Sequence, residues 1–145
     1  MKVQDQDIFH GVALTQLVEH PSFKALNKAS KRYGHYLLNQ DRRLFVKYRT
    51  NDGLAWQFVF STSEIRAIKE DQKLKGHTFV ILVCGYSTVC ALSAGDLDVL
   101  LDLDGPGAQS IRVEAPPGRS MIVNGSYGRL PRTLPHKSYP AKLFA

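Results

Sequence analysis

The chain has 145 residues, of which 43% are hydrophobic and 22% are charged. This composition is that of one globular domain, and it excludes a disordered tail, a collagen-like repeat and a disulfide-stapled scaffold. Nineteen Lys and Arg residues stand against thirteen Asp and Glu residues, so the formal net charge of +6 favours an acidic partner.

The N-terminal segment predicts an amphipathic helix over residues 5 to 19, because its apolar side chains are spaced three and four positions apart. Its broad apolar face would consist of Ile8, Phe9, Val12, Ala13, Leu17 and Val18. Pro21 closes this helix and opens a further helical turn over residues 21–30, which Gly34 ends.

Three strand-like runs follow at residues 35–39, 43–50 and 54–60, rich in aromatic and β-branched side chains. Residues 51–53, Asn-Asp-Gly, are typical of a tight hairpin turn, because Asp-Gly readily takes positive φ values. The three runs are therefore predicted to form an antiparallel meander. Its inner face would carry Trp56, Phe58 and Phe60.

The second half begins with a capping box at Ser61 and Glu64 that opens a second helix. Residues 78–84 are too apolar for a strand with one solvated face, so they are predicted to be the most buried strand. A turn at Gly85-Tyr86-Ser87 then leads to a returning strand. After it we expect a third helix from Ala94 to Leu103, capped by Ser93, and a short hairpin of residues 111–115 and 120–125.

The predicted fold class is α+β: a single domain over residues 1–128, with an N-terminal helix followed by a largely antiparallel sheet and two further helices. Residues 129–145 are predicted to be an extended, Pro-rich C-terminal tail, either packed across the body or partly disordered. The N-terminus has no apolar signal-peptide core, and no apolar run approaches the roughly eighteen residues of a membrane span. No membrane association is expected, and the cytoplasm is the expected compartment.

Few residues carry the spacing of a catalytic or metal site. Cys84 and Cys90 lie in apolar runs and are expected to be buried and reduced, and neither has the Cys/His spacing of a zinc site. His10 and His20 have the chemistry of general bases, but no nucleophile-elbow sequence accompanies them. No phosphate-binding glycine loop occurs. The sequence therefore predicts no metal, no cofactor and no catalytic residue, and it favours a protein that is not an enzyme.

The opening order of elements resembles the core of restriction-endonuclease-like folds. Such nucleases need an Asp and a Glu-x-Lys on adjacent strands, because the carboxylates hold Mg²⁺ while the lysine orients the attacking water. Lys47 matches the lysine, but Phe45 stands where the glutamate belongs, and the third strand offers Gln57 where an acid would serve. The motif is therefore incomplete, and a degenerate or atypical nuclease is the least favoured of the alternative functions.

Charge is polarised along the chain. Residues 24–49 hold eight basic residues and one acid, whereas residues 96–104 hold four Asp and no base. Aromatic residues are interleaved with the cations, and such a mixture suits nucleic acid, since bases stack on aromatic rings and phosphates pair with Lys and Arg. The favoured function is a non-catalytic binding module for nucleic acid or another polyanion. Its predicted contact residues are Lys28, Lys31, Arg32, Arg42, Arg43, Lys47 and Arg49.

A protein-interaction module is the alternative. In it the same basic face would bind an acidic protein, or the Asp-rich residues 96–104 of a second copy in a homodimer.

The strand-like runs LFVKYRT, WQFVF and VILVCG carry an F-x-K-Y-x-T, W-x-F-x-F and L-V-C pattern. This pattern resembles a group of small bacterial proteins, and the resemblance covers roughly residues 8 to 125. It implies an accessory protein of bacterial or mobile-genome type, and it supplies no activity and no catalytic residues to carry over.

Overall fold

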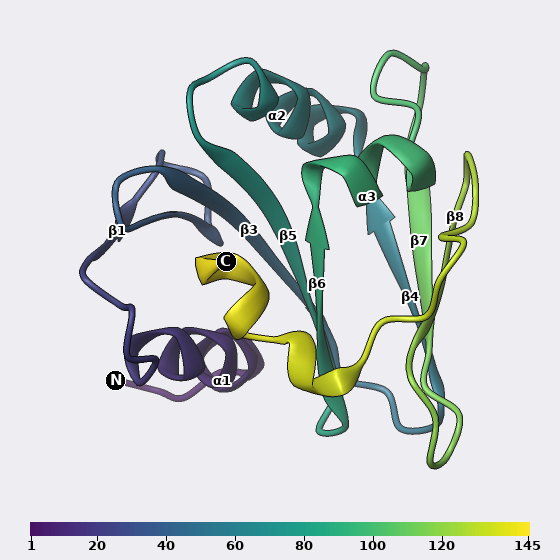
Figure 1. Cartoon of the computed structure of the whole chain (residues 1–145), viewed down its shortest axis with the longest axis horizontal. Helices are drawn as coiled ribbons and strands as arrows, with labels where there is room; N and C mark the ends of the chain where they lie inside the picture. The colour runs from purple at the N-terminus through teal and green to yellow at the C-terminus, as the bar shows by residue number, and fades with distance from the viewer.

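The computed structural model describes all 145 residues and has the predicted α+β class, with helix α1 first (Figure 1). The strands form a five-stranded sheet in the order β1-β2-β3-β5-β6 and a three-stranded sheet in the order β4-β7-β8. No helix combines the length and the apolar character needed to cross a membrane. The elements are α1 (Asp5–Val18), β1 (Leu26–Lys28), β2 (His35–Leu38), β3 (Arg42–Arg49), β4 (Ala55–Phe60), α2 (Thr62–Gln72), β5 (His77–Cys84), β6 (Thr88–Ser93), α3 (Ala94–Leu100), β7 (Gln109–Glu114), β8 (Ile122–Gly125) and the 3-10 helices η1 (His136–Ser138) and η2 (Ala141–Phe144).

The five-stranded sheet is covered on both faces. One face packs against α1 and the C-terminal segment, and the other packs against α2, α3 and the three-stranded sheet. In Figure 1 the C-terminal segment, drawn in yellow, runs from β8 across to α1. The tail therefore lies against the body, which is the first of the two arrangements that the sequence left open. Contrary to prediction, it is not extended throughout, because residues 136–138 and 141–144 form the 3-10 helices η1 and η2.

The burial of residues 78–84 is confirmed. β5 lies between β3 and β6, and only its first residue, His77, is exposed. Alternate side chains of β5 pack on opposite faces of the sheet: Val80 and Leu82 face α2 and the three-stranded sheet, whereas Ile81 and Val83 face α1. A strand with two apolar faces needs covering layers on both sides, which explains its uninterrupted apolar sequence.

The predicted meander is wrong in its third strand. β2 and β3 pair antiparallel, but β3 then pairs in parallel with β5, and β4 joins the second sheet beside β7. β4 buries Trp56 and Phe58 on one face and exposes Gln57 and Val59 on the other. The middle of β3 is buried on both faces, as β5 is, whereas β4 has one exposed face. β5 therefore suits the place beside β3 at the centre of the sheet better than β4 does. The Asn-Asp-Gly segment connects the two sheets and does not close a hairpin.

The helical turn predicted over residues 21–30 is also wrong. Residues 26–28 form β1, an edge strand paired with β2. Asn39 stabilises the extended chain, because its side-chain Oδ1 accepts hydrogen bonds from the backbone N–H groups of Lys24 and Ala25. A contact fifteen residues away in sequence thus overrides the local helical signal.

The other elements agree with prediction apart from two details. Ser61 and Ser93 cap α2 and α3, and β5-β6 and β7-β8 are antiparallel hairpins. α3 ends at Leu100 and not at Leu103. α1 has a narrower apolar face than expected, because Ile8, Val12 and Val18 are exposed. Both cysteines are free and buried, as predicted.

Candidate nucleic-acid interface

Two of the seven predicted contact residues are neutralised by carboxylates. Arg42 Nη1 lies 2.5 Å from Asp41 Oδ1, and Lys47 Nζ lies 2.5 Å from Glu64 Oε2. Burial acts to raise the pKa of Glu64, but hydrogen bonds from Lys47 and Ser61 outweigh it and hold this pKa below its usual value. Glu64 is therefore ionised at neutral pH, and Lys47 is committed to it.

The surroundings of Lys47 do not match the nuclease motif. The carboxylate that contacts it is Glu64, at the start of α2, whereas the motif needs two carboxylates on adjacent strands. No group of three or more His, Cys, Asp and Glu side chains is arranged to hold a metal ion. The residues that are present do not assemble the magnesium site of such a nuclease.

The other five predicted contact residues keep their charge uncompensated. Arg43 Nη1 donates to the carbonyl of Lys75 over 3.0 Å, and Arg32 Nη2 donates to the hydroxyl of Ser63 over 2.7 Å. Both partners are neutral, so these bonds orient the guanidinium groups without cancelling their charge. Three exposed residues take part in no ion pair, namely Lys28, Lys31 and Arg49.

The structure separates these cations into two groups along β3. The loop of residues 29–34, between β1 and β2, lies beside the C-terminal half of β3, since the backbone N–H of Val46 donates to the carbonyl of Gly34. Lys31, Arg32 and Arg49 therefore lie toward the same end of the sheet. Arg42 and Arg43 lie at the opposite end of the eight-residue strand, about 20 Å away at the rise of a β-strand.

Five aromatic rings in contact connect this loop with the turn between β5 and β6. The ring centroids are 4.7 Å apart for Tyr33 and His10, 5.6 Å for His10 and Tyr48, 5.4 Å for Tyr48 and Phe9, and 5.2 Å for Phe9 and Tyr86. We call these five residues the aromatic row. Its two ends are open to solvent, because Tyr33 is 57% exposed and Tyr86 is 80% exposed.

The buried members of the aromatic row hold the exposed ones in place. Phe9 and His10 are neighbours on α1, and both are buried. Burial lowers the pKa of His10 against the opposite effect of Asp7, so the imidazole is neutral at pH 7 and packs as an uncharged ring. Gly34 allows the close approach of the loop: its φ is +79°, and a Cβ there would lie 2.8 Å from the Val46 carbonyl oxygen and 3.0 Å from His10 Cε1.

A buried chain of hydrogen bonds anchors the loop that carries Arg32. His35 Nε2 lies 2.6 Å from Asp71 Oδ2, and His35 Nδ1 lies 2.7 Å from Ser30 Oγ. The carboxylate of Asp71 accepts from the Nε2–H group of His35, and His35 Nδ1 shares a hydrogen bond with the Ser30 hydroxyl. Ser30, His35 and Asp71 are hydrogen-bonded in the same order as the members of a Ser-His-Asp catalytic triad. Here, however, the Ser30 oxygen also accepts a hydrogen bond from the backbone N–H of Arg32, which closes the turn. We interpret these hydrogen bonds as a structural anchor for the loop.

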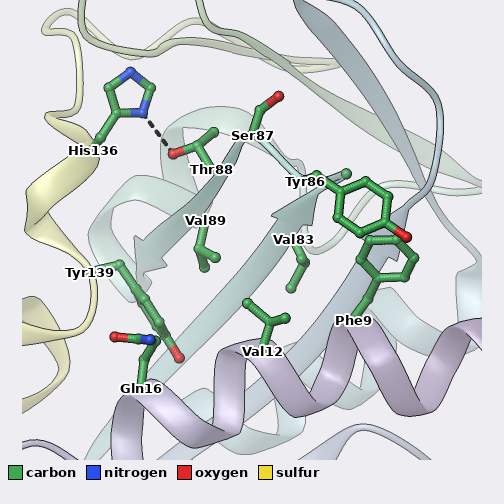
Figure 2. Close-up of a pocket in the computed structure, with 11 residues that line it drawn as sticks. Phe9, Val12, Gln16, Val83, Tyr86, Ser87, Thr88, Val89, His136 and Tyr139 are labelled. Carbon is green, nitrogen blue, oxygen red and sulfur yellow. Dashed lines mark hydrogen bonds between the residues drawn. The ribbon is translucent and has the colours of Figure 1, made fainter.

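A cavity of about 400 Å³ adjoins the Tyr86 end of the aromatic row, between α1 and the turn that joins β5 to β6. His136, from the C-terminal segment, closes one end (Figure 2): its Nδ1 lies 2.6 Å from Thr88 Oγ1, and its Nε2 lies 3.0 Å from the Arg119 carbonyl oxygen. We call this cavity the Tyr86 pocket. It is lined by Phe9, Val12, Gln16, Val83, Gly85, Tyr86, Ser87, Thr88, Val89, His136 and Tyr139.

The Asp-rich segment has less free charge than its sequence indicates. Asp96 pairs with Lys142 over 2.8 Å, and Asp104 pairs with Lys69. Two of the four aspartates thus already have a cation partner within the chain. This pairing weakens the case for a homodimer in which the segment binds the basic face of a second copy.

The sequence reasoning missed three members of the aromatic row, Phe9, His10 and Tyr86. Tyr86 carried a usable signal, because an aromatic residue in a Gly-x-Ser turn has little chance of burial. Phe9 and His10 carried none, since nothing local distinguishes their rings from ordinary core positions. Tyr33 and Tyr48 are two of the aromatic residues interleaved with the cations of residues 24–49, and the structure places both in the row.

Comparison with known proteins identifies no matching family model, no matching curated protein and no matching solved structure.

Proposed function

We propose that the protein binds single-stranded nucleic acid, with bases stacked on Tyr33 and Tyr86 and phosphates held by the cations beside these rings. The observation that carries the proposal is the aromatic row, whose open ends adjoin cations that have no acidic partner. Stacking of one base on an aromatic side chain contributes about 1–3 kcal/mol, and it tolerates any base because every base has a π-face.

The charges needed for phosphate contacts lie next to the rings in the chain. Lys31 and Arg32 precede Tyr33, and Arg49 follows Tyr48. The carbonyl of Arg49 also accepts a 2.9 Å hydrogen bond from the Gly85 N–H, so its backbone adjoins the turn that carries Tyr86. Cations at both ends of the aromatic row suit a strand that runs along it.

An unpaired strand is favoured over a duplex. In a duplex, neighbouring base pairs already cover both faces of each base, so an exposed tyrosine ring has nothing to stack on without unpairing them. The phosphate contacts carry no sequence information, and we expect weak sequence preference.

The stacking part of the proposal is tested by fluorescence anisotropy with a labelled oligonucleotide of mixed sequence at about 50 mM salt, where electrostatic binding is strong. Tyr33→Ala and Tyr86→Ala are each expected to lower affinity by about 5-fold or more, since each removes a stacking contact. Tyr127→Ala is the matched control, because this tyrosine is 65% exposed but lies outside the aromatic row. Equal binding by all three variants would contradict stacking on the row.

The electrostatic part is tested by the salt dependence of the same binding. The double variant Lys31→Ala/Arg32→Ala is expected to reduce the slope of log K against log salt by about 1.4, at about 0.7 per phosphate contact on a single strand. The control double variant removes the same charge from exposed residues beyond β8, Arg129 and Arg132. Equal effects in both would mean that net charge alone drives binding. Absence of any binding by the native protein would favour an acidic protein partner instead.

A further inference from the structure

We infer that the Tyr86 pocket takes up one unpaired base of the bound strand and so acts as its anchoring site. This inference rests on the proposed function and names the part of the ligand that the pocket recognises. A volume of about 400 Å³ falls within the range of pockets that hold small-molecule ligands.

The pocket has the polarity that an uncharged heterocyclic ring requires. Figure 2 shows Phe9 and Tyr86 at one end, Thr88 and His136 at the other, and valine side chains between them. A base has an apolar face and a polar edge. Its face would lie on the valines against Tyr86, and its edge would point toward Thr88.

The polar side chains that line the pocket are Gln16, Ser87, Thr88 and His136. Because the Arg119 carbonyl can only accept, His136 donates to it from the Nε2–H group, and His136 Nδ1 shares a 2.6 Å hydrogen bond with Thr88 Oγ1. The Thr88 hydroxyl also lies 3.8 Å from Met121 Sδ, and its oxygen has two lone pairs, so at least one can accept from a ligand in the pocket. Gln16 offers both a donor and an acceptor. None of the lining residues is Lys, Arg, Asp or Glu, which favours a neutral ring over a charged group.

Phosphates on either side of the base would meet cations outside the pocket. Arg49 and Arg119 are exposed, and each is joined to the pocket by a backbone contact: the carbonyl of Arg49 accepts from Gly85, and the carbonyl of Arg119 accepts from His136. Lys137 follows His136 directly and is also exposed. A neutral cavity with cations around it fits a base with its flanking phosphates, and this charge arrangement distinguishes it from a site for a wholly apolar ligand.

The wall formed by the C-terminal segment is fixed in advance. Tyr139 is buried, and its hydroxyl donates a 2.6 Å hydrogen bond to the Ala13 carbonyl on α1. Lys142 donates to the carbonyl of Ala91 and pairs with Asp96. Because these bonds hold the C-terminal segment against both α1 and the sheet, the pocket is preorganised, and binding a base does not require this wall to become ordered.

The test uses the full chain and blocks the pocket from its exposed side. Val12 lines the pocket and is 46% exposed, whereas Val18, on the same helix, is 47% exposed and lies outside it. Val12→Trp therefore fills the pocket, and Val18→Trp is the matched control for the added ring. The probes are an oligothymidylate with one central 2-aminopurine and free 2-aminopurine riboside, followed by anisotropy and by base fluorescence.

The native protein and Val18→Trp are expected to change the 2-aminopurine fluorescence of the strand, and Val12→Trp is not. Affinity of Val12→Trp for the strand should fall by about 5-fold or more, which is the effect of losing one stacked base. Native affinity and an unchanged fluorescence response in Val12→Trp would overturn the pocket inference and leave the proposed function intact. If the native protein bound no strand, the proposed function and the pocket inference would both fail. Tighter binding of the free riboside than of the strand would assign the pocket to a small molecule and also overturn the inference.

Discussion

Replacing Asp71 by Ala should destabilise the protein strongly, because it removes the acceptor of a buried hydrogen bond. The side chains of His35 and Asp71 are each only 8% exposed, and their atoms are 2.6 Å apart. Without Asp71, the Nε2–H group of His35 is buried without a partner. Breaking a buried pair by removing one member costs about 3–5 kcal/mol, and we expect about 3 kcal/mol, the lower end of this range.

The expected shift of the melting temperature follows from the chain length. For 145 residues the unfolding entropy near the midpoint is about 0.3 kcal/mol/K, so a loss of about 3 kcal/mol lowers Tm by about 10 °C. Urea unfolding followed by circular dichroism measures the free energy directly. Asp71→Asn keeps an acceptor oxygen, and its expected cost is only about 1 kcal/mol.

Glu70→Ala is the matched control, since this neighbouring acid of α2 is exposed and pairs with Lys73 at the surface. Its expected cost is below about 0.5 kcal/mol. A loss of free energy in Asp71→Ala no greater than in Glu70→Ala would refute the anchoring role. The anchor also predicts a functional effect: Asp71→Ala should weaken oligonucleotide binding, because the loop that carries Arg32 and Tyr33 is released.

Two further predictions concern pH and thiol chemistry. Burial acts to raise the pKa of Asp96, but hydrogen bonds from Lys142 and Ser93 outweigh it and hold this pKa below its ordinary value. The stability that Asp96 contributes is present above the ordinary Asp pKa and is lost as pH falls through its folded-state pKa. The Lys142→Met variant lacks this contribution, so its unfolding free energy should fall less than that of the native protein between about pH 6 and about pH 2. An unchanged pH profile would contradict this. Burial raises the pKa of Cys90 to about 12 and also raises that of Cys84, so a disulfide exchange reagent should label both thiols only after unfolding, and rapid labelling of the native protein would disprove their protection.

The sequence by itself determined the elements whose signals are local or depend on hydrophobicity alone. The capping box at Ser61 and the cap at Ser93 define their helix starts through hydrogen bonds within four residues. The apolar run of β5 requires cover on both faces wherever it lies. The burial of both cysteines follows from the same reasoning. The sequence also located the basic and aromatic stretch to which Arg32, Tyr33 and Tyr48 belong.

Only the tertiary structure decided which strands are neighbours and which cations are available. β3 pairs with β5 because two strands buried on both faces belong at the centre of the sheet, and no turn residue encodes that choice. β1 is extended because it pairs with β2, and Asn39 holds the residues just before it by accepting from the N–H groups of Lys24 and Ala25. Lys47 and Arg42 are held by carboxylates, whereas Arg49 and Lys31 are not, and this difference depends on side-chain contacts in space. The aromatic row joins α1, the loop of residues 29–34, β3 and the turn between β5 and β6, so its rings meet only when these segments have packed together.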